Sequence, residues 1–321
     1  MTAAIGEHQT GRWRVFAENW DPSYGSPASF DWDDSDTVEQ AETGAGWAVA
    51  GIYDPMLPLA FIDGCRRAEL SMWVEHSTEG TRIPGLVGAY AVGAVTITPG
   101  QLARYAGIRI GRNAFWGGGY RSDVISPLGY RWASESTTAL DHLELLARLQ
   151  NRMRLAEGNL ALEAAAQGWC TVLDGPLNRV RAMHELVTGY VKTHRRQILP
   201  TPDHVRVPTL KVGERTRLFT AGTDRYTCYV RIGSSGPGGS PWGGIARLDL
   251  PAVAGLDASA ERATQLAGLL PRYAGVPHRD PRAPVNLTPS RNLETHLSRS
   301  LGRVELATRS ARDAVIAGAN S

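Results

Sequence analysis

The sequence has few cysteines and no long hydrophobic run. Its 321 residues include three cysteines, Cys65, Cys170 and Cys228, and none belongs to a C-x-x-C pair. Isolated cysteines form neither a disulfide framework nor a zinc site, so we expect a protein of the reducing cytoplasm. No stretch approaches about 18 consecutive apolar residues. The start, M-T-A-A-I-G-E-H, lacks the basic and apolar segments of a secretory signal. We therefore expect neither secretion nor a membrane span.

A strong charge imbalance is also absent. The 34 basic and 32 acidic residues give a net charge of +2. Global charge therefore neither indicates nor excludes a nucleic-acid partner, and any basic surface must be local. The glycine-rich segment 233–244 matches neither G-x-x-x-x-G-K-[ST] nor G-x-G-x-x-G. The sequence thus gives little support to a nucleotide-binding loop.

Two apolar runs are present that end in charged residues. The run 169–173 is rich in β-branched and aromatic residues and is closed by Asp174-Gly175-Pro176, which is typical of a buried strand that ends at a turn. The run 186–191 has the same form and is followed by Lys192, His194 and Arg195. If the two strands are neighbours, an acidic and a basic strand end lie side by side. That arrangement suits a metal held by carboxylates next to a phosphate held by cations.

A third apolar run, 59–62, meets Asp63-Gly64. Taken alone, Asp-Gly is a preferred hairpin pair. The second Asp-Gly, at the end of the run 169–173, favours a functional carboxylate instead. Strand-like alternation follows over 66–74, and 87–97 is a further strand candidate. The polar, glycine-rich and aromatic stretch 111–138 predicts a long surface loop.

The clearest predicted helix covers residues 139–167. Apolar residues recur there at steps of three and four, and Glu157 lies on this stripe between Met153 and Leu160. A carboxylate that faces a core needs a partner, which would be either a metal ion or an arginine such as Arg152 or Arg154.

The remaining segments complete the predicted order of elements. Residues 1–58 are predicted to form an aromatic-rich arm whose acidic tract, 31–42, is solvated. Strands are expected over 226–232 and 245–250, a helix over 258–270, and a final amphipathic helix over 289–317. With no internal repeat and no clean linker, residues 59–321 are predicted to be one domain on which the arm packs.

The order strand, hairpin, strand, helix, strand predicts an α/β fold, with an RNase H-like mixed sheet flanked by helices, an N-terminal arm and a C-terminal helix. Four motifs in this order resemble the NurA nuclease family in its bacterial form: F-I-D-G-C-R-R-A-E, V-L-D-G-P-L, G-Y-V-K-T-H-R and D-P-R-A-P-V-N-L. The resemblance extends over residues 63–301.

The resemblance implies a nuclease that depends on Mn²⁺ or Mg²⁺ and acts on DNA single strands and duplex ends. It also implies a homodimer docked on a HerA-type hexameric ATPase, in DNA repair or phage defence. Asp63 and Asp174 would be metal ligands, and Glu157 the helix acid. The family's C-terminal motif ends in a histidine on a helix, and three residues compete for that place: Asp280, Glu294 and His296. Glu69 is a further candidate acid.

The chemistry fits these residues independently of the family. Phosphodiester hydrolysis needs cations on the non-bridging oxygens, an activated water and a stabilised leaving oxygen, and carboxylates that hold Mg²⁺ or Mn²⁺ provide these functions. Lys192 would neutralise phosphate charge in the transition state, while His194 and Arg195 would bind phosphates. Three alternatives remain open. The chain would instead be a non-catalytic DNA-binding or clamp subunit of a translocase, an RNA-directed nuclease or phosphotransferase, or a regulatory partner of the ATPase.

Overall fold

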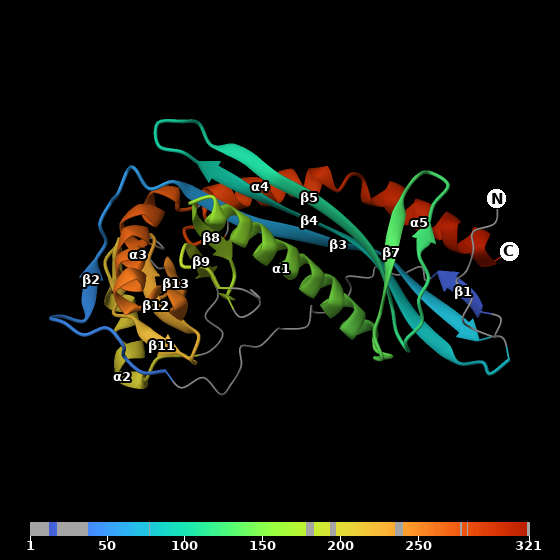
Figure 1. Cartoon of the computed structure of the whole chain (residues 1–321), viewed down its shortest axis with the longest axis horizontal. Helices are drawn as coiled ribbons and strands as arrows, with labels where there is room; N and C mark the ends of the chain where they lie inside the picture. The colour runs from blue at the N-terminus through green and yellow to red at the C-terminus, as the bar shows by residue number, and fades with distance from the viewer. Residues whose placement is uncertain are drawn as a thin grey trace.

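The computed structural model describes residues 13–17, 38–76, 78–177, 183–192, 197–234, 240–276, 278–280 and 282–319. Within them, one sheet of thirteen strands forms the centre of the molecule (Figure 1). The strands are β1 (Trp13–Ala17), β2 (Ala48–Ala50), β3 (Leu59–His76), β4 (Arg82–Ile97), β5 (Arg104–Trp116), β6 (Val124–Ile125), β7 (Arg131–Ser136), β8 (Cys170–Asp174), β9 (Val187–Val191), β10 (Glu214–Thr216), β11 (Phe219–Ala221), β12 (Arg225–Arg231) and β13 (Ile245–Pro251). The α-helices are α1 (His142–Ala166), α2 (Thr201–His204), α3 (Leu256–Leu269), α4 (Thr288–Ser300) and α5 (Val304–Ala319).

The strand order confirms the predicted topology. The central strands lie in the order β5-β4-β3-β8-β9. The first three pair antiparallel, whereas β8 and β9 run parallel to β3. A three-stranded meander followed by a helix and two parallel strands is the RNase H-like arrangement that the sequence predicts. Beyond β9, the antiparallel strands β13, β12, β10 and β2 extend the sheet.

Helices cover both faces of the centre because the strand residues alternate between two cores. On one face, Ala60 and Ile62 of β3 pack with Met153 and Leu160 of α1. On the other, Phe61 of β3 belongs to the same core cluster as residues of α3 and α4, namely Leu266, Leu293 and Leu297. Figure 1 shows α1 lying across the central strands and α5 at the end of the long β3–β4 hairpin. None of the helices in the described part of the chain has the length and apolar character needed to cross a bilayer.

Strand β3 does not end at Asp63, which corrects the prediction of a strand end or hairpin turn there. It continues for 18 residues, with Asp63 paired to Gly93 and Gly64 to Val92 of β4. The chain reverses only between His76 and Arg82, where Gly80 has a φ of +65°. The Asp-Gly pair therefore lies within the antiparallel ladder of β3 and β4, whose register is continuous from Leu59 to Ala68.

The surface loop predicted over 111–138 is also wrong. This segment contains the end of β5 together with β6 and β7, and its large aromatic residues are buried, with Trp116 at 1% exposure and Trp132 at 0%. They pack with Ala307 and Ala311 of α5. Burial against a helix nearly two hundred residues later in the chain is the reason why local composition misleads here.

The predicted helices over 139–167 and 258–270 correspond to α1 and α3. The single helix predicted over 289–317 is instead two, α4 and α5, separated at Gly302, whose φ of +78° is incompatible with a continuing helix.

Only part of the predicted N-terminal arm can be compared. Backbone pairing joins β1 to β3, while residues 1–12 and 18–37 lie outside the described residues. The prediction that the acids of 31–42 are solvated is wrong for Glu42, which forms an ion pair of 2.6 Å with the buried Arg215. The domain boundary at residue 58 stays a prediction.

Candidate active site

Asp63 and Asp174 lie next to each other on adjacent parallel strands. The last paired residues of β3 and β8 are Ile62 and Leu173, and each aspartate follows its member of that pair. Because side chains alternate along a strand, both aspartates are on the face of Phe61 and Val172, which α3 and α4 cover. The sequence predicted that these two acids come together, and the register between β3 and β8 brings them to the same end of the strand pair.

Glu157 reaches the pair from α1, on the opposite side of the sheet. It is buried, with 1% of its surface exposed. Its Oε1 lies above Gly64, where an added Cβ would be only 2.6 Å from that oxygen. Gly64 is thus required for the close approach of α1 to β3 and not for a turn.

Burial and the charges of neighbouring acids raise the pKa of two of the three carboxyls, those of Asp63 and Glu157. Burial raises the pKa of Asp63 well above its ordinary value, and the charges of Asp174 and Glu157 add to this effect. Burial also raises the pKa of Glu157 to about 7, although Arg154 opposes the shift. The influence of both other acids on Asp63 indicates that the three carboxyls form one electrostatic cluster.

Two cations neutralise part of this cluster. Arg154 Nη1 donates to Glu157 Oε2 at 2.9 Å and to the main-chain oxygen of Asp174 at 2.5 Å. Lys192, directly after β9, donates from Nζ to Asp174 Oδ2 at 2.7 Å. The acidic end of β8 and the basic end of β9 therefore do lie side by side. Of the two partners considered for Glu157, a metal ion and an arginine, the arginine Arg154 contacts one of its oxygens.

A second acid is connected to Lys192 through an asparagine. Lys192 Nζ also donates to Asn286 Oδ1 at 2.9 Å, and Asn286 Nδ2 donates to Asp280 Oδ2 at 2.5 Å. Asn286 and Asp280 are both buried. Burial alone would raise the pKa of Asp280, but the hydrogen bond from Asn286 and the nearby arginines lower it. Asp280 therefore stays ionised and fixes the amide that holds Lys192.

The cluster fits a divalent cation in its donors and its charge. Mg²⁺ and Mn²⁺ prefer carboxylate oxygens, and three carboxylates face only two cations here. Glu157 Oε1 is moreover buried without a hydrogen-bond partner, which is costly unless a ligand satisfies it. As the side chains stand, no group of three or more Asp, Glu, His or Cys residues in the described chain is arranged to hold a metal ion. Lys192 engages Asp174 Oδ2, and Arg154 engages Glu157 Oε2.

The other candidate residues have partners of their own or lie outside the described chain. Glu69, six residues beyond Asp63 on β3, is buried and satisfied by Arg67 at 2.7 Å and by Trp132 Nε1 at 2.7 Å. The ring of His296 stacks on Tyr105 of β5 at 4.2 Å between centroids. Glu294, two positions earlier on α4 and hence on another side of that helix, forms an ion pair with Arg282 at 3.1 Å. His194 and Arg195 lie outside the described residues.

Asn286 is the residue of this site that sequence reasoning missed. It belongs to the motif D-P-R-A-P-V-N-L, but only its contact with Lys192, 94 residues earlier, reveals its position at the site. A polar amide between apolar residues at 285 and 287 was the available signal, since a buried amide needs partners.

Comparisons with known proteins give one result relevant to the fold. No protein family and no curated protein matches the sequence. Among solved structures, the chain is similar to the NurA nuclease from Sulfolobus solfataricus, with 10% sequence identity and a TM-score of 0.47. The similarity covers 82% of this chain and 86% of that one.

Proposed function

We propose that the protein is a metal-dependent nuclease that hydrolyses phosphodiester bonds in DNA single strands or at duplex ends. One observation carries the proposal. Asp63 and Asp174 meet at the same end of two parallel strands, and Glu157 enters from α1 with one oxygen buried and unpartnered. A stable fold has no need to gather three mutually repelling carboxyls in this way.

Asp63, Glu157 and Asp174 would hold Mn²⁺ or Mg²⁺, which supplies charge stabilisation to the phosphate and lowers the pKa of a water. Lys192 lies at the edge of this cluster with its ammonium fixed by Asn286, so it is placed to neutralise a phosphate oxygen. When Lys192 turns from Asp174 to a phosphate, Asp174 Oδ2 becomes free for other partners. Arg154 keeps Glu157 oriented through the other carboxylate oxygen.

The finer parts of the proposal rest on the sequence motifs that resemble the NurA family. They include action as a homodimer together with a HerA-type hexameric ATPase, in break repair or phage defence. The sequence contains no P-loop motif, so energy for movement along DNA has to come from a partner.

A second function is favoured by a specific observation. Both Asp174 and Glu157 already have basic partners, at 2.7 and 2.9 Å. Carboxylates paired in this way also suit a non-catalytic DNA-binding or clamp subunit, in which the acids only hold β8, β9 and α1 together.

Cleavage of end-labelled single-stranded DNA distinguishes the two functions. If the protein is a nuclease, the wild-type protein should give cleavage products with Mn²⁺ or Mg²⁺ and none with EDTA, and Asp174→Ala should give none with either metal. Wild-type protein that binds the DNA but leaves it uncut with Mn²⁺, with Mg²⁺ and with EDTA would favour the clamp. A matched RNA substrate tests whether the activity is specific to DNA.

A further inference from the structure

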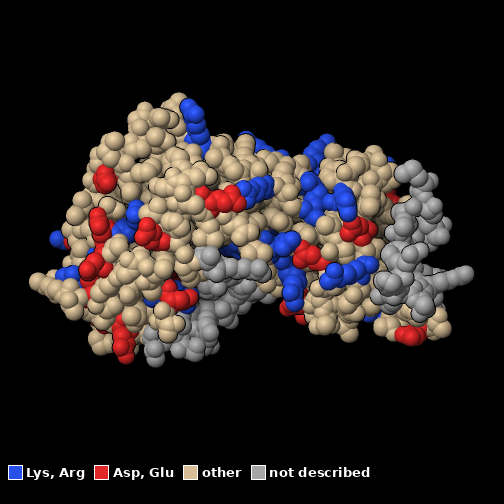
Figure 2. Space-filling model, viewed as in Figure 1, with Lys and Arg blue, Asp and Glu red and all other residues tan. Residues whose placement is uncertain are grey.

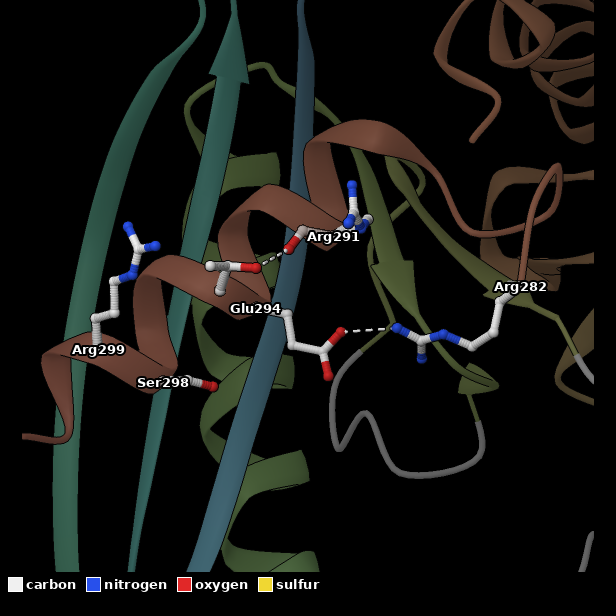
Figure 3. A pocket seen from close by; sticks show the side chains of 6 residues that line it. Arg282, Arg291, Glu294, Ser298 and Arg299 are labelled. Carbon is white, nitrogen blue, oxygen red and sulfur yellow. Dashed lines mark hydrogen bonds and ion pairs between the residues drawn. The ribbon is translucent and has the colours of Figure 1, made fainter. Parts of the chain in front are cut away.

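A pocket of about 490 Å³ lies beside α4, lined by Arg282, Arg291, Glu294, Thr295, Ser298 and Arg299. Figure 3 shows Arg291, Glu294, Ser298 and Arg299 on successive turns of α4, with Arg282 reaching toward Glu294 from the preceding segment. The buried residues Leu293 and Leu297 lie on another stripe of the helix. The pocket is thus formed by the polar flank of a helix whose apolar side is fixed on the sheet.

The lining is strongly basic for this protein. Three arginines and one glutamate give the pocket a net charge of +2 (3 − 1), equal to that of the entire chain. Figure 2, by contrast, shows basic and acidic side chains intermixed over the face that it presents. Because the overall composition is balanced in charge, nucleic-acid binding would need a local basic surface. The pocket beside α4 is a candidate for that surface.

The three arginines differ in how far the protein satisfies them. Arg282 pairs with Glu294 at 3.1 Å, and Arg291 lies 3.6 Å from Asp280. The side chain of Arg299 makes no hydrogen bond or ion pair with the residues that the structure describes. A guanidinium has five N–H donors and matches the oxygens of a phosphate in pairs. The pocket thus retains donors for an anion.

A chain of contacts connects the pocket with the carboxylate cluster. Arg291 of the pocket lies 3.6 Å from Asp280, whose Oδ2 accepts a hydrogen bond from Asn286. Asn286 in turn accepts from Lys192, which donates to Asp174 of the cluster. Asp63, Asp174 and α4 also share one face of the sheet, so the pocket and the carboxyls are neighbours on that face.

We propose that Arg282, Arg291 and Arg299 bind a phosphate of the nucleic-acid strand, next to the phosphate that is cut. The ligand is a phosphate group, and its source is either an internal phosphodiester or a terminal monophosphate. That the phosphate belongs to a DNA strand rests on the proposed function. Glu294 limits affinity, because it occupies Arg282 and repels the phosphate.

Binding of fluorescein-labelled oligothymidylate, followed by anisotropy in EDTA, tests this inference. Arg299→Gln removes a guanidinium without breaking a hydrogen bond or ion pair to the described residues. We expect it to weaken binding by about 3- to 10-fold and to lower the salt slope by about 0.7. Glu294→Gln should tighten binding. Arg309→Gln on α5, where Arg309 is exposed and paired with Asp313, is the matched control and should change neither quantity.

The source of the phosphate follows from three oligonucleotides: linear with a 5′-phosphate, linear with a 5′-hydroxyl, and circular. If Arg299→Gln weakens binding only of the oligonucleotide with a 5′-phosphate, the pocket binds a terminal phosphate. If it weakens binding of the circular oligonucleotide equally, the pocket binds an internal phosphate. Wild-type affinity and salt slope in Arg299→Gln, or an equal loss in Arg309→Gln, would overturn the inference. Because binding is measured without metal, failure of cleavage by the wild-type protein is a separate result that affects only the proposed function.

Discussion

Lys192 Nζ lies 2.7 Å from Asp174 Oδ2, across the boundary between the parallel strands β8 and β9. Asp174 ends β8 and Lys192 directly follows β9, so the fold itself brings an acid and a base together at the carboxyl ends of two interior strands. Asn286 contacts the same ammonium at 2.9 Å. Lys192 is therefore held at the carboxylate cluster by two independent contacts, which fixes where a substrate phosphate would meet a positive charge.

Lys192→Ala should reduce turnover more than binding. Loss of a transition-state contact lowers kcat by about 10²-fold, whereas loss of an ordinary phosphate contact only weakens binding and flattens its salt dependence. Turnover should be measured at saturating DNA over a range of salt concentrations. Lys211→Ala, at an exposed position, is the control. An unchanged kcat in Lys192→Ala would remove this residue from the catalytic centre.

Asn286→Ala should lower kcat with little change in KM, because Asn286 positions Lys192 and does not itself reach the substrate. Removal of a buried amide also costs about 1–3 kcal/mol of stability. Asn113→Ala is the control that measures this loss of stability alone. Asn113 is another buried asparagine, on β5, and its side chain donates to Glu135 at 2.8 Å. Equal losses of turnover in the two variants would show that Asn286 is only structural.

Asp63→Asn should stabilise the metal-free protein. Burial and two neighbouring acids disfavour the ionised form of Asp63, so its replacement by a neutral isostere removes repulsion worth on the order of 1 kcal/mol. The melting temperature in EDTA should rise, and stabilisation by added Mn²⁺ should be lost.

Asp249→Asn provides the contrast for this experiment. Asp249 is also buried but accepts hydrogen bonds from Arg247 at 2.9 Å and from Thr227 at 3.1 Å, so its replacement should destabilise the protein. A lower melting temperature in both variants would indicate that Asp63 is an ordinary structural acid.

Glu157 should make the metal-free protein less stable as the pH rises. Its pKa is about 7 in the folded protein, while the unfolded chain releases the proton near the ordinary value of 4.5. Between these values the folded state binds more protons, so the free energy of unfolding falls with increasing pH, by at most about 3 kcal/mol. Urea unfolding in EDTA between pH 4.5 and 8 measures the slope. The dependence of the free energy of unfolding on pH should be weaker in Glu157→Gln. An identical dependence in that variant would contradict the assignment of the raised pKa to Glu157.

The periodic segments of the fold were predictable from the sequence. The helix α1 and strands β8, β9, β12 and β13 follow from hydrophobic patterns within each segment, and their order predicts the RNase H-like topology. The strand end expected at Asp63 was wrong, because Asp-Gly is typical of a turn when it is considered in isolation. The requirement that actually selects glycine at position 64, the approach of Glu157 across the sheet, comes from a residue 93 positions later (157 − 64).

The meeting of the candidate residues was predictable to a similar extent. Asp63, Asp174 and Lys192 were singled out because each is a charged residue that directly follows an apolar run of the sequence. Glu157 was found because it interrupts an apolar stripe, but its partner Arg154 could not be distinguished from a metal ion. Asn286 and the arginines of α4 depend on long-range packing of the chain after Asp280, which no local pattern records.

The most direct test of the account is cleavage of end-labelled single-stranded DNA in Mn²⁺ by two variants of the same helix, Glu157→Gln and Glu163→Gln. Both remove one carboxylate from α1, but Glu157 is buried at the cluster, whereas Glu163 is exposed and paired with Arg109. The account predicts wild-type cleavage in Glu163→Gln and a loss of at least about 10²-fold in Glu157→Gln, with DNA binding retained in both. Equal cleavage by the two variants would contradict the central claim that the three carboxyls form a metal-dependent nuclease centre.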